Sequence, residues 1–215
     1  MPTNSSQSGQ GRQLSVLAAL LVLDSMHFIF ARLLLPHLAP AISVTYVLVV
    51  STVEVGALSL IRGRLDWSVL RRHAGLFLAI GLLIGVSTRI NYEAVAFINP
   101  GTASLLSQTS VLFSLVFGVV WLGDRWNAPQ LLGSALSLIG VFVISFQPDD
   151  YLRIGSVLVV GSALMYALHA AIAKRYGGEM DLMSFFFFRL LATSTVLVVL
   201  TAATGGWTWP SGRAW

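Results

Sequence analysis

Long apolar stretches, separated by short breaks that are polar or contain Pro or Gly, follow one another along almost the whole chain. A helix that crosses the hydrocarbon core of a bilayer needs about 20 mainly apolar residues. The pattern therefore predicts seven membrane-spanning helices, at residues 14–35, 41–61, 75–97, 101–122, 129–147, 154–174 and 183–203. Because the breaks are short, we predict an all-α integral membrane protein whose helices form one bundle of antiparallel neighbours. Small residues spaced four apart, such as Gly81 and Gly85, predict close contact between helices.

The composition supports a membrane protein and excludes other classes. Hydrophobic residues make up 56% of the chain and charged residues only 10%, whereas a soluble domain carries about 25% charged residues. Lipid is therefore a predicted partner. The net charge of +4 does not indicate nucleic acid, because no basic patch is interleaved with aromatic residues. The chain has no cysteine, which excludes disulfides and thiolate metal sites.

The basic residues predict the orientation of the chain in the membrane. Residues 1–13 are polar and Gly/Ser-rich, which is typical of a disordered tail, and the run at 14–35 is too long for a cleaved signal peptide. If the tail is cytoplasmic, eight basic residues flank the inner ends of the helices and three flank the outer ends. The inner set is Arg12, Arg62, Arg64, Arg71, Arg72, Arg125, Lys174 and Arg175, and the outer set is Arg32, Arg153 and Arg213. This asymmetry predicts a multi-pass protein of the cytoplasmic membrane with its N-terminus inside.

An internal repeat divides the chain. A shift of about 141 residues lays the segment beginning SVLAALLVLDSMHF over the segment beginning SVLVVGSALMYALH. The first copy, residues 14–147, contains five predicted helices. The second copy, residues 154–215, contains two helices and a loop. Because five is odd, the second copy enters the membrane with the opposite orientation, as in inverted-repeat membrane proteins.

Several short segments then suggest a family. They are Tyr92-Glu93-Ala94-Val95, Leu122-Gly123-Asp124-Arg125, Gln130-Leu131-Leu132-Gly133, Ile139-Gly140-Val141 and Arg189 within Phe-Phe-Arg-Leu-Leu. In order and spacing the chain resembles the EamA-type branch of the drug/metabolite transporter superfamily. The resemblance implies two inverted repeats of five helices, so that helices eight to ten are missing and the chain is C-terminally truncated. Many members have a helix-kinking Pro where this chain has Ser110-Val111, so the resemblance does not decide whether the fourth span is kinked.

The resemblance also implies a function. It predicts a secondary transporter, or a fragment of one, that moves a small organic metabolite such as an amino acid across the cytoplasmic membrane, with export as the expected direction. Proton coupling and a homodimer are left open. The alternatives are a non-transporting seven-helix sensor or scaffold, and an inactive truncated fragment. The chain contains no phosphate-binding Gly-rich loop, no His-Glu-x-x-His and no Gly-x-Ser-x-Gly. We therefore expect no enzymatic activity, no cofactor and no metal.

The candidate pathway residues are polar or ionisable side chains inside the predicted spans, because a mid-helix charge costs roughly 2.5–3.5 kcal/mol to insert. Such a cost favours a cavity or an ion pair over a lipid-facing position. The candidates are Asp24, His27, Glu54, Arg89, Tyr92, Glu93, Gln108, His169 and Arg189.

Each candidate also has a structural alternative. Arg89 and Glu93, four residues apart, form either an intrahelical ion pair or a site in which Arg89 holds an anionic group of the substrate. Asp24 and His27 share a helix face, where they handle protons or only fix helix packing. In the structural alternatives, His169 is a core residue, and Arg189 extends its charged head to the membrane surface. Glu54 then serves helix packing, and Gln108 makes a polar contact with a helix. In the functional interpretation, Tyr92 lines the entrance of the pathway at the outer end of the third span.

Overall fold

The computed structural model describes residues 38–63, 65–125, 127–145, 154–178 and 180–204, together with the single residues 29, 33 and 36. The predicted tail, most of the first predicted span and the C-terminal loop lie outside the described residues.

Every regular element in this described part of the chain is an α-helix. The helices are α2 (Pro40–Ile61), α3 (Trp67–Arg72), α4 (Ala74–Ala94), α5 (Pro100–Ser107), α6 (Thr109–Val120), α7 (Ala128–Ser145), α8 (Ile154–Tyr176) and α9 (Leu182–Ala203). Five spans are long and apolar enough to cross a membrane, namely α2, α4, α5 with α6, α8 and α9. The predicted span at 129–147 forms α7, which is not among these five.

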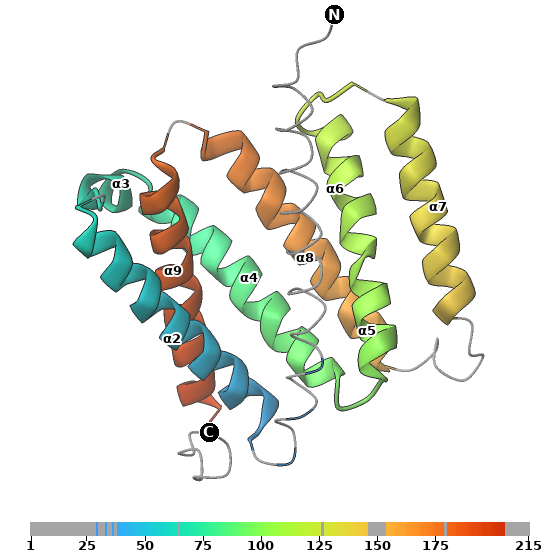
Figure 1. Cartoon of the computed structure of the whole chain (residues 1–215), viewed down its shortest axis with the longest axis horizontal. Helices are drawn as coiled ribbons and strands as arrows, with labels where there is room; N and C mark the ends of the chain where they lie inside the picture. Colours follow the sequence, from blue (N-terminus) through green and yellow to red (C-terminus); the bar gives the residue numbers. More distant parts are fainter. Residues whose placement is uncertain are drawn as a thin grey trace, which may run out of the picture.

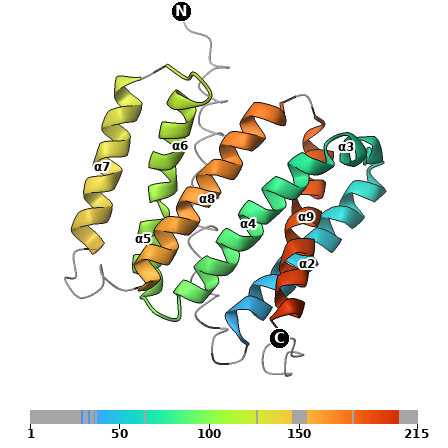
Figure 2. The same cartoon turned by 180° about the vertical axis from the view of Figure 1, so that it is seen from behind.

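Helix α4 lies at the centre of the bundle. It packs against both α8 and α9, and α2 packs on α9 while α6 packs on α8. Figures 1 and 2 show α4 between α8 and α9 from both sides, with α7 at the edge beyond α6. The order of neighbours therefore brings α2 and α4 of the first predicted repeat against α9 of the second.

The contact between α4 and α9 depends on two glycines. A Cβ atom at Gly81 would lie 2.8 Å from the carbonyl carbon and 2.8 Å from the Cβ of Ala192. At Gly85 it would lie 3.0 Å from a methyl group of Val196. The close approach predicted from the four-residue spacing of these glycines is therefore confirmed.

Hydroxyl groups join α2 to α9. The Oγ1 atoms of Thr45 and Thr201 lie 2.8 Å apart, and Thr52 Oγ1 lies 2.7 Å from Ser194 Oγ. All four residues are buried. Inside a bilayer these uncharged hydroxyl groups serve as hydrogen-bond partners for one another, and each such hydrogen bond contributes about 0.6 kcal/mol to the stability of the bundle.

Helix α3 is a six-residue element that the hydrophobic pattern did not predict. Its N-cap is Asp66, whose carboxylate accepts a hydrogen bond from the backbone N–H of Ser68 at 2.9 Å. This hydrogen bond, with that from the Ser68 side chain, holds the pKa of Asp66 below its usual value of 3.8. Trp67 then packs edge-on against Phe187 and Phe188 of α9. These ring contacts fix α3 against the start of α9.

One end of the bundle collects the positive charges, and we call it the basic end. It contains the end of α2, helix α3, the turn between α6 and α7, and the turn between α8 and α9, which lie on the same side of the bundle in Figure 1. Its basic residues within the described part of the chain are Arg62, Arg71, Arg72, Arg125, Lys174 and Arg175. The asymmetry seen in the sequence thus corresponds to one face of the folded chain.

Candidate functional site

Arg89 and Glu93 lie on the last two turns of α4 and form an ion pair. Arg89 Nε donates to Glu93 Oε1 at 2.9 Å, with the two side chains 19% and 43% exposed. The i, i+4 spacing brings the two groups onto one face of the helix. The charge of Arg89 therefore already has a neutralising partner on its own helix.

Tyr92, on the same part of α4, is a packing residue in this structure. It is buried with Val44 of α2 and Leu197 of α9 in one apolar cluster. Nearby, Asn91 Oδ1 accepts a hydrogen bond from Ser162 of α8 at 2.7 Å. The C-terminal half of α4 thus contacts three neighbouring helices through adjacent residues.

Gln108 marks a break in the fourth span. The helix stops at Ser107 and starts again at Thr109, and the backbone N–H of Gln108 bonds to the carbonyl of Leu105, three residues earlier. The hydroxyl of Ser107 donates to the Ser104 carbonyl, and that of Thr109 to the Leu106 carbonyl, both at 2.7 Å. Hydroxyl groups that bond back to the preceding turn bend helices. The hydrogen bonding of the span therefore tightens by one residue at Gln108 without a proline, while the backbone there keeps helical angles, φ −65° and ψ −14°. Gln108 itself is half-buried.

His169 and Arg189 come from two helices that flank α4. His169 of α8 is 2% exposed, and its Nδ1 atom has no hydrogen-bond partner in the described part of the chain. Arg189 of α9 has a buried Nε atom that is also without a partner there. The guanidinium lies over the ring of Phe186 at 5.5 Å.

Glu54 is exposed on α2. Thr52 and Gly56 both contact α9, and Glu54 lies two residues from each, which places it on the opposite side of the helix. The structure therefore separates Glu54 from Arg89 and from Arg189. Asp24 and His27 lie outside the described residues.

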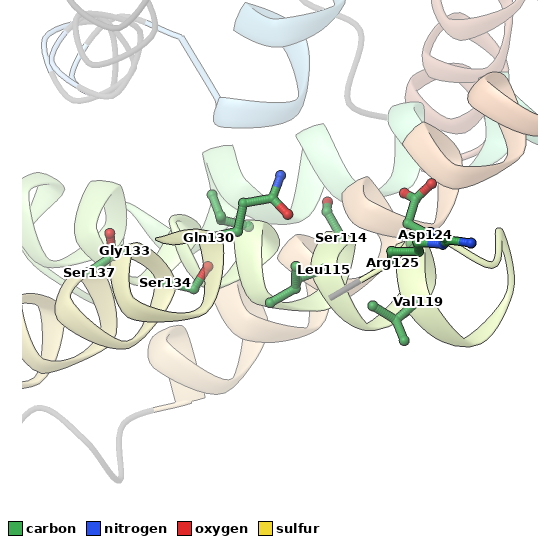
Figure 3. Close-up of a pocket in the computed structure, with 11 residues that line it drawn as sticks. Ser114, Leu115, Val119, Asp124, Arg125, Gln130, Gly133, Ser134 and Ser137 are labelled. Atoms are coloured by element: carbon green, nitrogen blue, oxygen red, sulfur yellow. The ribbon is translucent and has the colours of Figure 1, made fainter. Parts of the chain in front are cut away.

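A polar crevice of about 460 Å³ separates α6 from α7 near the basic end. Figure 3 shows it lined by Ser114 of α6 and by Gln130, Ser134 and Ser137 of α7, with Asp124 at one end. Asp124 and Gln130 were named above only within the segments that suggest a family, and the crevice itself was not predicted. The i, i+4, i+7 spacing of the three α7 residues is the signal that could have revealed the polar face.

The turn between α6 and α7 is tied to the end of α8. Lys174 Nζ lies 2.5 Å from Asp124 Oδ2, and Arg175 Nη1 donates to the Trp121 carbonyl at 2.8 Å. Arg175 also lies over the Trp121 ring at 5.7 Å. Gly118 permits this arrangement, because a Cβ atom there would lie 3.0 Å from Asp124 Oδ2. Charged and aromatic contacts thus join the end of α6 to the end of α8 at the basic end.

Comparison with known proteins gives a consistent result. The profile of the family described as "EamA-like transporter family" matches residues 13–146, more than half of the chain. A probable amino-acid metabolite efflux pump of Escherichia coli is 28% identical over 99 residues, which cover 41% of this chain and 33% of that protein. An uncharacterized transporter of Clostridium kluyveri is 27% identical over 130 residues, covering 55% of this chain and 42% of its own length.

A plant protein is also similar. Protein CLT3, chloroplastic, of Arabidopsis thaliana is 31% identical over 67 residues, which cover 31% of this chain and 15% of that protein. The matched segments therefore span less than half the length of each of these relatives. No solved structure matches the chain.

Proposed function

Because the chain belongs to the EamA-like transporter family, we propose that it acts as a secondary carrier of a small organic metabolite. The family match over residues 13–146 carries this proposal. It is supported by five helices long and apolar enough to cross a membrane, with polar and ionisable groups inside them. We propose that lipid surrounds the bundle and that the solute crosses between its helices.

We propose further that the solute is an amino acid or a related metabolite and that transport is outward. The support is that one relative is named a probable amino-acid metabolite efflux pump. For the orientation, we propose that the basic end faces the cytoplasm, because basic residues are enriched on the cytoplasmic side of membrane proteins. From the basic residues of the sequence, we propose that the N-terminus is also cytoplasmic and that the protein lies in the cytoplasmic membrane.

The tightened turn in the fourth span supports a pathway beside Gln108. An amide side chain inside the membrane needs hydrogen-bond partners, and a polar solute can supply them. We therefore propose that the half-buried amide of Gln108 contacts the solute.

The other pathway residues are proposals of the same kind. They are Asp24, His27, Glu54, Arg89, Tyr92, Glu93, His169 and Arg189. For proton coupling, we propose Asp24 and His27 as the groups that exchange protons. Asp24→Asn should then remove the pH dependence of transport in proteoliposomes. Transport that keeps its pH dependence in this variant would exclude Asp24 from the coupling step.

The test of function is transport by the purified protein in proteoliposomes. Vesicles loaded with a single unlabelled amino acid should accumulate the same amino acid in radiolabelled form by exchange, above the level of protein-free vesicles. Each of the twenty amino acids is assayed in turn, with vesicles that contain heat-denatured protein as the inactive control. Exchange of no amino acid would contradict the proposed substrate class and favour the alternative, a non-transporting membrane scaffold or an inactive fragment.

A further inference from the structure

A second polar cavity, of about 470 Å³, lies at the basic end between α3 and the turn that joins α8 to α9. Figures 1 and 2 both show these two segments side by side. The polar residues that line the cavity come from two stretches of the chain. They include Asp66, Ser68 and Arg72 from α3 and its N-cap, and Arg175, Tyr176 and Asp181 from the end of α8 and the turn after it. Two distant stretches of sequence thus enclose one cavity.

The cavity carries charges of both signs in equal number. Arg72 and Arg175 supply two positive charges, and Asp66 and Asp181 supply two negative charges, with His73 of the lining counted as neutral. A ligand that is only an anion would meet repulsion from the two carboxylates, and a ligand that is only a cation would meet repulsion from the two arginines. The cavity therefore matches a zwitterion, in which an anionic and a cationic group lie a few bonds apart.

The two arginines keep most of their hydrogen-bonding capacity. Arg72 Nη2 donates to Ser68 Oγ at 3.4 Å, and Arg175 Nη1 donates to the Trp121 carbonyl at 2.8 Å. A guanidinium carries five N–H donors, and within the described part of the chain neither arginine forms an ion pair. The remaining donors are available to a phosphate group, which a guanidinium binds through two parallel hydrogen bonds.

The two carboxylates are held in place by the helices that they cap. Asp66 accepts a hydrogen bond from the backbone N–H of Ser68 at 2.9 Å, and Asp181 accepts one from that of Ser184 at 3.0 Å. These bonds cap α3 and α9. A carboxylate has about four acceptor positions, so Asp66 and Asp181 can also accept hydrogen bonds from an ammonium group.

The surroundings of the cavity favour a lipid over a dissolved solute. Each carboxylate is followed directly by an exposed apolar residue: Trp67, 53% exposed, follows Asp66, and Leu182, 80% exposed, follows Asp181. Leu182 begins a helix that is long and apolar enough to cross a membrane, so its side chain offers a surface to an acyl chain. Trp and Tyr residues are enriched at the level of the lipid head groups, and Tyr176 lines the cavity itself. The charged cavity thus borders directly on apolar surface.

We propose that this cavity binds the head group of a phospholipid that carries a primary ammonium, namely phosphatidylethanolamine. Arg72 and Arg175 bind the phosphate, and Asp66 and Asp181 accept hydrogen bonds from the ammonium. A choline head group has no N–H to donate to the carboxylates, and a glycerol head group has no positive charge. The site is separate from the solute pathway proposed above and does not depend on transport.

The test measures lipid binding to the purified full chain in detergent by native mass spectrometry, which identifies each bound lipid by its mass. Phosphatidylethanolamine, phosphatidylglycerol and phosphatidylcholine with identical acyl chains are added separately at the same concentrations. The wild type should bind phosphatidylethanolamine at least threefold more tightly than either of the other two lipids. Equal binding of all three lipids would show attachment without recognition of the head group, and would overturn the proposal.

Two arginines of α3 form a matched pair of variants. Arg72→Gln removes a charge from the lining and should weaken the binding of phosphatidylethanolamine about fivefold, which corresponds to about 1 kcal/mol. Arg71→Gln removes the neighbouring exposed charge, which does not line the cavity, and should change that binding less than twofold. An equal loss in the two variants would show a general effect of charge at the membrane surface, and would contradict a site in the cavity.

Asp181→Asn tests recognition of the ammonium without removing the helix cap, because asparagine caps helices as well as aspartate does. This variant should at least halve the preference for phosphatidylethanolamine over phosphatidylglycerol, and an unchanged preference would contradict the role of Asp181.

Glycerophosphoethanolamine separates a lipid from a dissolved ligand, because it has the same head group and no acyl chains. It should displace bound phosphatidylethanolamine only at a concentration more than 100-fold higher than that of the lipid. Displacement at equal concentration would overturn the assignment to a lipid and indicate a dissolved zwitterion as the ligand.

Discussion

Replacing Gly81 with alanine tests whether backbone contact between α4 and α9 holds the bundle together. The new Cβ would lie 2.8 Å from the Ala192 carbonyl carbon, 2.8 Å from the Ala192 Cβ and 3.0 Å from the Ala192 oxygen. Two of these three atoms belong to the backbone, so no rotamer change removes the overlap. The helices must separate, and overpacking of this kind costs about 1–3 kcal/mol.

A gain in helix propensity opposes this cost. Alanine is about 1 kcal/mol more favourable than glycine in a helix interior. The matched control is Gly161→Ala in α8, where a Cβ would meet no atom within 4 Å. Gly161→Ala should therefore stabilise the protein by up to about 1 kcal/mol. Gly81→Ala should be about 1–3 kcal/mol less stable than this control.

The free energy of unfolding can be measured by titrating the protein with sodium dodecyl sulfate in mixed micelles and following tryptophan fluorescence. Ala192→Gly in the Gly81→Ala background removes only the Cβ contact, so it should restore part of the lost stability. If Gly81→Ala were as stable as Gly161→Ala, the close backbone contact would not exist in the membrane-embedded protein, and the α4–α9 packing argued above would be wrong.

Three further predictions follow from named contacts. Reversing one charge of the Asp124–Lys174 pair should slow solute exchange up to about fivefold, since exposed pairs contribute about 0.2–1 kcal/mol. Swapping the two residues should restore the rate. A swapped variant that stays slow would contradict the role of the pair. Thr52→Val and Ser194→Ala should show a coupling energy of about 0.6 kcal/mol in a double-mutant cycle of unfolding, and strict additivity would argue against their hydrogen bond. The pKa of Asp66 in the folded protein lies below 3.8. The stabilising contribution of the Asp66 carboxylate is therefore fully present above pH 3.8 and is lost as the pH falls through the folded pKa. Asp66→Asn should lose this pH dependence in acid unfolding curves, and an unchanged curve would contradict the prediction.

The positions of the long helices could be predicted from the sequence because bilayer thickness fixes their length. The spans predicted at 41–61, 154–174 and 183–203 correspond to α2, α8 and α9 within two residues at each end. Membrane helices are defined by a one-dimensional property, the length of an apolar run. No knowledge of neighbours is needed to find them.

Two local features were beyond this kind of prediction. Helix α3 has only six residues, too few to show a helical period, and it is fixed by the contact of Trp67 with α9. The tightened turn at Gln108 depends on which carbonyl groups accept hydrogen bonds from the hydroxyls of Ser107 and Thr109. Hydrophobicity carries no information about that choice, and the proline that usually marks a kink is absent from this position.

The two ion pairs differ in the same way, because one joins residues close in the sequence and the other joins residues far apart. The Arg89–Glu93 pair could be predicted because four residues along a helix bring two side chains to one face. The Asp124–Lys174 pair joins residues 50 positions apart, and only the packing of α6 against α8 brings them together. The polar crevice beside Asp124 was missed for the same reason, since its two walls belong to different helices.

The two arginines inside the spans lead to a functional distinction that residue type alone does not give. Arg89 and Arg189 have the same insertion cost, so the sequence offered both as pathway candidates, Arg89 for holding an anionic group and Arg189 for the cavity. The structure places a carboxylate 2.9 Å from Arg89 and leaves Arg189 Nε buried without a partner in the described residues. An ion pair within one helix lowers the cost of placing its arginine in the membrane. Arg89 could therefore hold another anion only if Glu93 moved away.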